Sequence, residues 1–416
     1  MQVFKFGGAS VKDANGVKNL ASVLQQVGYK KTLVVVSAMG KTTNALELVL
    51  ENYFNNKAEL QSSFQEVKKF HNAILLDLFD NENDDVFSKV SSLFKELDSF
   101  LGRNKSPDYN FVYDQVIGYG ELVSTTIISE YFNTIGLKNN WLDVREFIKT
   151  DDYYRGSNVD WDATQQLISK NFDTSVLNIT QGFLGSDANN FTTTLGREGS
   201  DYTAAIFAYC LNAQDVTIWK DVPGVLNADP RYFENAQLIN KISYREAIEL
   251  AFYGASVIHP KTLQPLQRKE IPLFVKSFLN PTNPGTCVGK GKTLEPEVPC
   301  LIVKKNQVLI SLSSLDFSYI VEDNISHIFS LLHSYKMKVD VIQNSAISFS
   351  VCVDNIYNNL DKLLQHLKAK FKVTCNENVS LYTIRHYNQN AINQLEKDKT
   401  VLLKQLTQET VQIVTK

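Results

Sequence analysis

The start of the chain combines two short apolar strands with a glycine turn and a helix. Residues 2–6 (QVFKF) are followed directly by Gly7 and Gly8, and residues 12–26 carry apolar side chains at helical spacing. Residues 32–36 (TLVVV) show no alternation of polar and apolar side chains, which is typical of a strand in a parallel sheet covered on both faces. The pattern therefore predicts a βαβ unit and an α/β protein.

Length and charge limit what the rest of the chain can be. With 416 residues the chain exceeds one ordinary core, so we expect two or three domains. Lys and Arg total 42 and Asp and Glu total 45, a balance that argues against a nucleic-acid partner bound through a basic surface. No apolar stretch approaches the roughly 20 residues of a membrane span, and no signal-peptide pattern begins the chain. The 5 cysteines lack metal-ligand spacing, so we expect reduced thiols in a cytoplasmic protein without a membrane partner.

Changes in the pattern of expected helices and strands along the chain predict where the domains lie. The first domain, residues 1–280, contains a nearly continuous helical insertion at about residues 45–112. Residues 281–300 concentrate proline and glycine, which predicts a linker or a hairpin. Beyond them the order β-α-β-β-α predicts a small α+β domain at residues 301–378. The order begins again at residues 379–416, where the last helix and strand are missing, so we expect a shortened second unit.

Two short segments that follow strands carry candidate anion-binding residues. Gly7 and Gly8 let the backbone approach an anion closely, and Lys5 offers a charge for a phosphoryl group. Ser37 and Thr43 follow the second strand, and ligands of open α/β sheets bind at the carboxyl ends of strands. A plain turn at the glycines and a helix N-cap near Thr43 are the simpler interpretations, and they stay open.

Two glycine-flanked helix starts add charged candidates. Glu121, within GYGELVS, can hold a substrate ammonium group, although acidic residues are common near helix N-termini in any case. The segment TLGREGSDYTAA contains Arg197 and opens a helix with Ser200 and Asp201. Arg197 can bind a carboxylate bidentately, and Asp201 can order the groups around a transferred phosphoryl group or its metal. Ser200 also suits a plain N-cap, which does not exclude a ligand role.

Basic residues return around one later loop. Lys220 and Asp221 end a strand-like run, and Arg231 follows an Asp-Pro turn, so two cations around one loop suit a polyphosphate. A solvated surface loop is the competing interpretation of the turn residues. Further on, His259 precedes a proline and has no nucleophile near it in the sequence, which favours a structural role.

Taken together and in this order, the segments resemble the aspartate kinases of the amino-acid kinase family. Residues 5–10 (KFGGAS) match the family's KFGGTS signature, with Ala9 in place of Thr, and residues 182–185, 194–205 and 222–231 match further blocks. The resemblance covers nearly the whole chain. It implies an α/β amino-acid kinase-like three-layer sandwich with a mainly parallel sheet, followed by two ACT-like (ferredoxin-like) α+β units, the second of them shortened.

The resemblance also implies a reaction, in which ATP phosphorylates the side chain of L-aspartate to 4-phospho-L-aspartate, with Mg²⁺ as the partner of ATP and no metal site built by the protein. The acceptor carboxylate is already ionised at neutral pH, so this chemistry needs positioning and charge neutralisation rather than a general base. Lys5 and Asp201 are the expected catalytic residues. The expected aspartate ligands are Ser37, Thr43, Glu121, Arg197 and Ser200, and the expected nucleotide ligands are Lys5, Gly7, Gly8, Lys220, Asp221, Leu226, Arg231, Ser256 and Lys261.

Two positions depart from the family's pattern. Lys220 stands where the family usually has Thr, and Ser256 stands where the family usually has Lys. We therefore hypothesise that one cation has been relocated, and that Lys220 or the nearby Lys261 replaces the missing charge. The hypothesis predicts that Lys220 contributes to the binding of ATP.

The C-terminal pair of units resembles ACT domains, which usually dimerise and bind a pathway amino acid. The resemblance implies a homodimer and feedback by lysine or threonine; the stretch from Val339 to Ser345 fits the family's pattern, whereas residues 315–324 match it poorly. Two alternatives stay open. One is another amino-acid kinase acting on glutamate or acetylglutamate, and the other is an amino-acid sensor that has lost catalysis.

Overall fold

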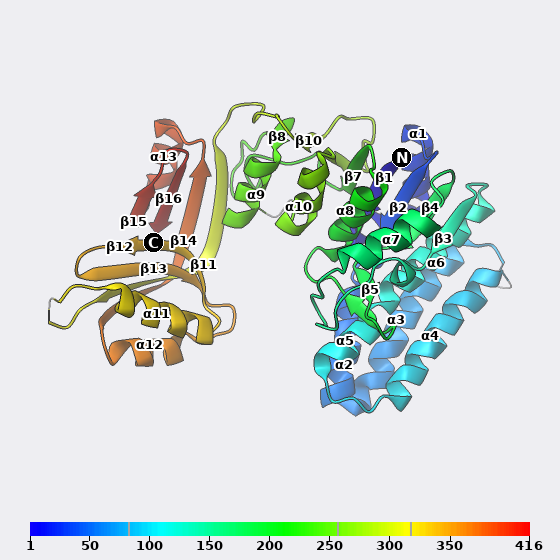
Figure 1. The fold of residues 1–416 in the computed structure, drawn as a ribbon, viewed down its shortest axis with the longest axis horizontal. Helices are drawn as coiled ribbons and strands as arrows, with labels where there is room; N and C mark the ends of the chain where they lie inside the picture. The colour runs from blue at the N-terminus through cyan, green and yellow to red at the C-terminus, as the bar shows by residue number, and fades with distance from the viewer. Residues whose placement is uncertain (82–83, 256–257, 317) are drawn as a thin grey trace. The chain divides into compact units, whose positions relative to one another are not determined.

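The chain forms two compact units in the computed structural model (Figure 1). The first unit contains Met1–Val225 and most of the following chain up to Leu294, and the second contains Leu226–Gln237 and Glu295–Lys416. Within the described ranges, no helix combines the length and the apolar character that crossing a membrane requires. The structure describes residues 1–81, 84–255, 258–316 and 318–416.

The first unit is built on a mainly parallel sheet with the strand order β3-β4-β2-β1-β7-β9-β10-β8. β1 (Gln2–Phe6) lies between β2 (Thr32–Val36) and β7 (Asp215–Lys220) and runs parallel to both, so the predicted βαβ unit is confirmed. Every residue of β2 is buried, which explains the absence of alternation in its sequence. The carboxyl ends of these three strands meet at one edge of the sheet. The other strands are β3 (Asn139–Leu142), β4 (Leu177–Gln181), β8 (Lys241–Ser243), β9 (Leu273–Ser277) and β10 (Thr286–Gly289).

Long helices occupy the stretch in which a helical insertion was expected, and Figure 1 shows them gathered beside one part of the sheet. Phe64, Val67 and Ile74 recur at helical spacing in this stretch and are buried in the core that these helices share with the sheet. The first helix begins where Asp13 accepts a hydrogen bond from the backbone N–H of Gly16. The helices of this unit are α1 (Ala14–Val27), α2 (Thr42–Asn55), α3 (Lys57–Leu78), α4 (Asp85–Arg103), α5 (Tyr109–Ile117), α6 (Tyr119–Thr134), α7 (Trp161–Asn171), α8 (Gly199–Leu211), α9 (Tyr244–Tyr253, which continues into the second unit) and α10 (Pro260–Lys269).

The proline- and glycine-rich stretch at residues 281–300 contains a strand of the first sheet. β10 lies within it and pairs antiparallel with β9 and parallel with β8. Gly285 precedes β10 with a φ of 66°, and a Cβ at this position would come within 2.1 Å of the carbonyl oxygen of Val275. β9 and β10 thus form an antiparallel pair, while the division of the chain at residues 280 and 300 stays a prediction.

The second unit is a six-stranded antiparallel sheet with the order β12-β13-β11-β14-β16-β15. Its two central strands, β11 (Cys300–Ser313) and β14 (Lys372–Arg385), are long enough to serve two α+β halves. α11 (Glu322–Ser334) and α12 (Leu360–Lys368) pack on the first half, and α13 (Gln389–Glu396) packs on the second. The remaining strands are β12 (Lys338–Asn344), β13 (Ser348–Asp354), β15 (Val401–Leu406) and β16 (Thr410–Thr415).

The second half takes one of its strands from the segment that precedes the first half. Residues 300–304 of β11 pair with residues 381–385 of β14, and a bulge between Lys304 and Gln307 separates this part from the rest of β11. The shortened unit expected at residues 379–416 is thus completed by residues far away in the sequence. The sequence-based division places residues 301–304 in the first α+β domain, because the local sequence of a strand does not indicate which strand it pairs with.

Candidate active site

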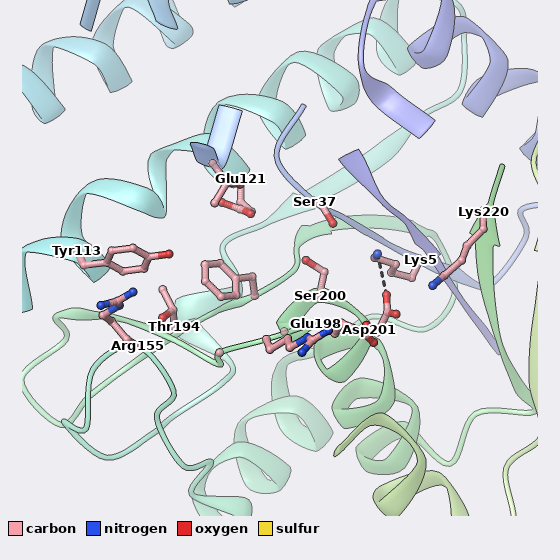
Figure 2. Close-up of a pocket in the computed structure, with 15 residues that line it drawn as sticks. Lys5, Ser37, Tyr113, Glu121, Arg155, Thr194, Glu198, Ser200, Asp201 and Lys220 are labelled. Atoms are coloured by element: carbon pink, nitrogen blue, oxygen red, sulfur yellow. Dashed lines mark ion pairs between the residues drawn. The ribbon is translucent and has the colours of Figure 1, made fainter. Parts of the chain in front are cut away.

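The carboxyl ends of β1, β2 and β7 border a cavity of about 480 Å³ in the first unit (Figure 2). This is the edge at which open α/β sheets bind their ligands. The structure brings together at this cavity residues that lie up to 215 positions apart in the sequence, as expected for strands that end at a common edge. The predicted site residues that line it are Lys5, Ser37, Thr43, Glu121, Arg197, Ser200, Asp201 and Lys220.

Lys5 and Asp201 form an ion pair with little contact to solvent. Lys5 Nζ lies 2.7 Å from Asp201 Oδ1, and the two side chains are 12% and 4% exposed. A Cβ at Gly7 would lie 3.2 Å from Lys5 Nζ, and a Cβ at Gly8 would lie 2.8 Å from the carbonyl oxygen of Ala38. The two glycines therefore let the backbone pass close to the Lys5 ammonium group and to the loop that follows β2.

Helix α8 begins at the cavity and places two predicted residues there. Glu198 precedes the helix in a left-handed backbone conformation, with a φ of 54°, and Ser200 and Asp201 occupy the first turn. A Cβ at Gly182 would come within 2.4 Å of the Ser200 Cβ, so only glycine lets the chain after β4 pass this close to α8. The backbone N–H groups of Gly199 and Asp201 donate to the carbonyl oxygens of Gly196 and Glu198, at 3.0 Å each. The positive end of the α8 dipole lies at the cavity, which makes this end of the helix suited to an anion.

Glu121 is a buried carboxylate in the first turn of α6. Its side chain is 3% exposed; Oε1 accepts the backbone N–H of Ala38 at 3.3 Å, and Oε2 has no hydrogen-bond partner among the described residues. Burial raises the pKa of Glu121 to about 8, against the opposing effect of the hydrogen bond from Ala38. A buried carboxylate with an unpaired oxygen on a cavity is a suitable binding group for an ammonium ion.

Ser37, Thr43, Arg197 and Lys220 complete the predicted set on the cavity. Ser37 directly follows β2, and its carbonyl oxygen accepts the hydroxyl group of Ser124 at 2.8 Å, which fixes the loop against α6. Thr43 lies in the first turn of α2, and Lys220 is the last residue of β7. Figure 2 shows Lys220 on the same side of the cavity as the Lys5–Asp201 pair, with Glu121 apart from both.

Four predicted nucleotide ligands of the first unit are not among the residues that line the cavity, namely Gly7, Gly8, Asp221 and Lys261. Asp221 is exposed in the turn after β7, and Lys261 lies in the first turn of α10. The ring of His259 accepts the backbone N–H of Lys261 at 3.2 Å, so His259 caps this helix, in agreement with the structural role that the sequence favoured. Ser256 lies outside the described residues.

Leu226 and Arg231 belong to the second unit. The guanidinium group of Arg231 lies 2.6 Å from Asp229, and its Nε also donates to the same carboxylate. A bidentate pair of this kind fixes the turn at Asp229. The roles of Leu226 and Arg231 in nucleotide binding stay predictions.

The cavity also holds residues that sequence reasoning missed. Phe183, Thr194 and Glu198 line it, and they lie within or beside the glycine-rich blocks that carried the resemblance. Tyr113 on α5 and Arg155 in the loop before α7 line it as well, with the Arg155 guanidinium 4.3 Å from the centre of the Tyr113 ring. No local pattern marks these two residues, because only the fold brings them to the cavity.

The carboxylates of this region do not gather into a metal centre. In the part of the chain that the structure describes, no group of three His, Cys, Asp or Glu side chains is suited to hold a metal ion. A magnesium ion that arrives with a nucleotide needs only one or two protein carboxylates, because phosphate and water oxygens supply the other ligands. Asp201 lines the cavity, and Asp221 follows β7.

Comparisons with known proteins identify the family of the chain. Residues 1–277 match the model of the amino acid kinase family. The chain is 33% identical over 347 residues to the lysine-sensitive aspartokinase 3 of Escherichia coli (strain K12), which covers 82% of this chain and 76% of that protein. The chain belongs to the aspartokinases of the amino acid kinase family. It is also 33% identical over 358 residues to aspartokinase 1 of Arabidopsis thaliana, a chloroplastic protein, covering 82% of this chain and 61% of the relative.

A solved aspartokinase is similar in fold to this chain along its length. Escherichia coli aspartokinase III in complex with lysine and aspartate matches 100% of this chain and 95% of its own, with a TM-score of 0.83 and 28% sequence identity. The same enzyme in complex with aspartate and ADP matches 100% of this chain and 96% of its own, with a TM-score of 0.82 and 28% identity. The expected aspartokinase fold, with its mainly parallel sheet and its antiparallel C-terminal sheet, is confirmed.

Proposed function

We propose that this aspartokinase transfers the γ-phosphoryl group of ATP to the side-chain carboxylate of L-aspartate, giving ADP and 4-phospho-L-aspartate. The reaction is the first step in the biosynthesis of lysine, threonine and methionine. The observation that carries the proposal is a single cavity in which a buried Lys5–Asp201 pair, the N-terminus of α8 and the buried Glu121 occur together. The Escherichia coli relative of similar fold has been seen with aspartate and ADP bound.

The chemistry follows from charge. The acceptor carboxylate is ionised at neutral pH, so it attacks phosphorus without a general base, and the obstacle is the repulsion between two anions. Lys5 offsets the charge of the transferred group, and Asp201 holds the Lys5 ammonium group in place. Glu121 binds the substrate ammonium group, Arg197 binds a carboxylate, and Ser37, Thr43 and Ser200 complete the aspartate site. Magnesium bound to ATP would supply further neutralisation, and Asp201 on the cavity is a carboxylate that would hold it.

ATP binds along the β1 and β7 side of the cavity in this proposal. Gly7 and Gly8 present backbone close to the phosphates, and Lys220 supplies a cation in place of the lysine that the family usually carries at position 256. Asp221, Leu226, Arg231 and Lys261 are further nucleotide ligands predicted from the resemblance. The position of Lys220 on the cavity supports the hypothesis of a relocated charge.

Replacing Lys220 by threonine is expected to raise the KM for ATP about tenfold or more and to leave the KM for aspartate nearly unchanged. The reason is that a charge-assisted hydrogen bond to phosphate contributes about 1.5–3 kcal/mol. Initial rates measured against each substrate in turn give both constants. Lys261→Ala is the matched variant: a larger rise in the KM for ATP with Lys261→Ala than with Lys220→Thr would place the relocated charge at Lys261 instead.

A hydroxylamine assay tests the reaction itself. The protein is incubated with ATP, magnesium and hydroxylamine, which traps an acyl phosphate as a hydroxamate, and each candidate amino acid is supplied separately. We expect hydroxamate with aspartate alone. A signal with glutamate or acetylglutamate would assign the chain to another amino-acid kinase activity, and no signal with any acceptor would favour an amino-acid sensor.

We further infer that the second unit makes the enzyme a homodimer and carries feedback control by lysine or threonine. The support is its two α+β halves and the lysine complex of the Escherichia coli relative. Light scattering after gel filtration measures the mass of the assembly, and hydroxamate rates with each amino acid measure inhibition. The cytoplasmic location stays a prediction from the sequence.

A further inference from the structure

Asp114 is a carboxylate on α5 that is 0% exposed. It accepts the backbone N–H of Thr194 at 2.8 Å and the hydroxyl group of Thr194 at 2.8 Å. It also accepts the backbone N–H of Arg155, at 3.1 Å and 3.2 Å from its two oxygens. One buried side chain of α5 therefore holds two segments that lie about 40 and 80 residues further along the chain.

Both fastened segments lead to the cavity. Thr194 ends β6 (Thr192–Thr194) and is followed by Leu195, Gly196 and Arg197 before α8 begins. Gly196 has a φ of 78°, and a Cβ there would lie 3.3 Å from the Cα of Gly156, so the loop around Arg155 lies directly against the glycine before Arg197. The position of the Arg197 backbone thus depends on how both segments are held.

The neighbours of Asp114 are themselves part of the cavity wall. Thr194, Arg155 and Tyr113 line the cavity, and Figure 2 shows them grouped on the side away from the Lys5–Asp201 pair. Arg155 has a φ of 65°, a left-handed conformation that costs free energy unless its surroundings hold it. The double hydrogen bond from its N–H to Asp114 is such a restraint.

The charge on Asp114 is maintained against its burial. Desolvation raises the pKa of Asp114 to about 6, and the hydrogen bonds from Thr194 and Arg155, together with the Arg155 charge, act in the opposite direction. Of the other titratable groups that act on it in the described residues, Tyr113 and Tyr154 have pKa values raised by burial and stay neutral throughout the range in which Asp114 titrates.

We propose that Asp114 is a positioning residue for acceptor binding, which holds the Arg155 loop and residues 194–197 in the arrangement that receives aspartate. The inference rests on the proposed function. Asp114 does not line the cavity, so it acts through Thr194 and Arg155 and takes no part in the chemical step.

The test replaces Asp114 by asparagine, which keeps the shape but turns one acceptor into a donor facing N–H groups. We expect the KM for aspartate to rise about 10- to 100-fold, because small displacements of binding groups are costly, while kcat and the KM for ATP change by less than about threefold. Thr194→Val, which removes one hydrogen bond to Asp114 and keeps the backbone bond, should give a smaller rise.

The pH dependence adds a readout that a merely structural role would not change. Asp114 takes up a proton as the pH falls through about 6 and then loses acceptor capacity towards Thr194 and Arg155. The KM of the wild type for aspartate should therefore rise more steeply below about pH 6. Asp114→Asn should show no steepening there, because its KM is already raised at higher pH.

Asp108→Ala is the matched control, since Asp108 caps the same helix through the N–H groups of Asn110 and Phe111. It should lower the melting temperature, as the loss of an N-cap does, and leave the KM for aspartate unchanged. If Asp114→Asn behaves like Asp108→Ala, the inference is overturned while the proposed function stands. If the wild type forms no hydroxamate from aspartate, the proposed function fails and the inference fails with it.

Discussion

Replacing Lys5 by methionine is expected to lower kcat by about 10³-fold, because it removes the fixed positive charge that offsets the charge of the transferred phosphoryl group in the proposed site. Methionine has a similar length and no charge, so the cavity keeps its shape. The KM for aspartate should change by only a few-fold, since Glu121 and Arg197 are the groups that bind the amino acid in this proposal. Initial rates at saturating ATP and varied aspartate separate the two constants.

The variant also leaves Asp201 buried without its partner, so stability has to be measured alongside activity. A buried charge whose partner is removed destabilises a protein by about 3–5 kcal/mol, and the Asp201 side chain is only 4% exposed. The double variant Lys5→Met, Asp201→Asn should recover most of the lost melting temperature and none of the lost activity. A Lys5→Met enzyme that kept kcat within tenfold of the wild type would exclude the proposed role of Lys5.

The parts of the fold and the site that could be predicted are those whose residues lie close together in the sequence. Strand β2 is buried along its whole length, so its apolar run was sufficient to predict a parallel sheet. Lys5 at the end of β1 and Lys220 at the end of β7 lie at one edge because β1 and β7 are parallel neighbours. The prediction that Ser200 and Asp201 open a helix is confirmed by the first turn of α8.

The parts that could not be predicted depend on contacts between distant segments. Asp114 accepts a hydrogen bond from Thr194, which lies 80 positions away in the sequence, and no sequence pattern around either residue indicates the other. The same holds for β11, whose first residues pair with the far end of β14 and complete a unit that starts 79 residues later in the sequence-based division. In both cases the local sequence predicts the helix or strand, and only the fold shows which distant segment it contacts.

Glu121→Gln is expected to raise the KM for aspartate about 100-fold, because the ammonium group would lose a charged partner whose side chain is only 3% exposed. The wild type should release a proton on binding at pH 7. Its pKa of about 8 keeps Glu121 largely protonated in the empty cavity, and the substrate ammonium group favours the ionised form. Calorimetry of aspartate binding in buffers of different ionisation enthalpy measures this release, which should be absent in Glu121→Gln.

The raised pKa of Glu121 also determines how the stability of the protein depends on pH. The pKa of Glu121 is raised from an ordinary value of 4.5, so the stability associated with its protonated form is fully present below pH 4.5 and is lost as the pH rises through about 8. Glutamine cannot ionise. The melting temperature of Glu121→Gln should therefore rise relative to that of the wild type between pH 4.5 and about pH 8, and the difference should persist at higher pH. If the melting temperatures of the two proteins changed with pH in parallel, the proposed burial of an ionisable group at this position would be contradicted. If the two melting temperatures diverged with pH and the KM for aspartate of Glu121→Gln were raised, Glu121 would be identified as a carboxylate that binds the amino group and lowers the stability of the protein.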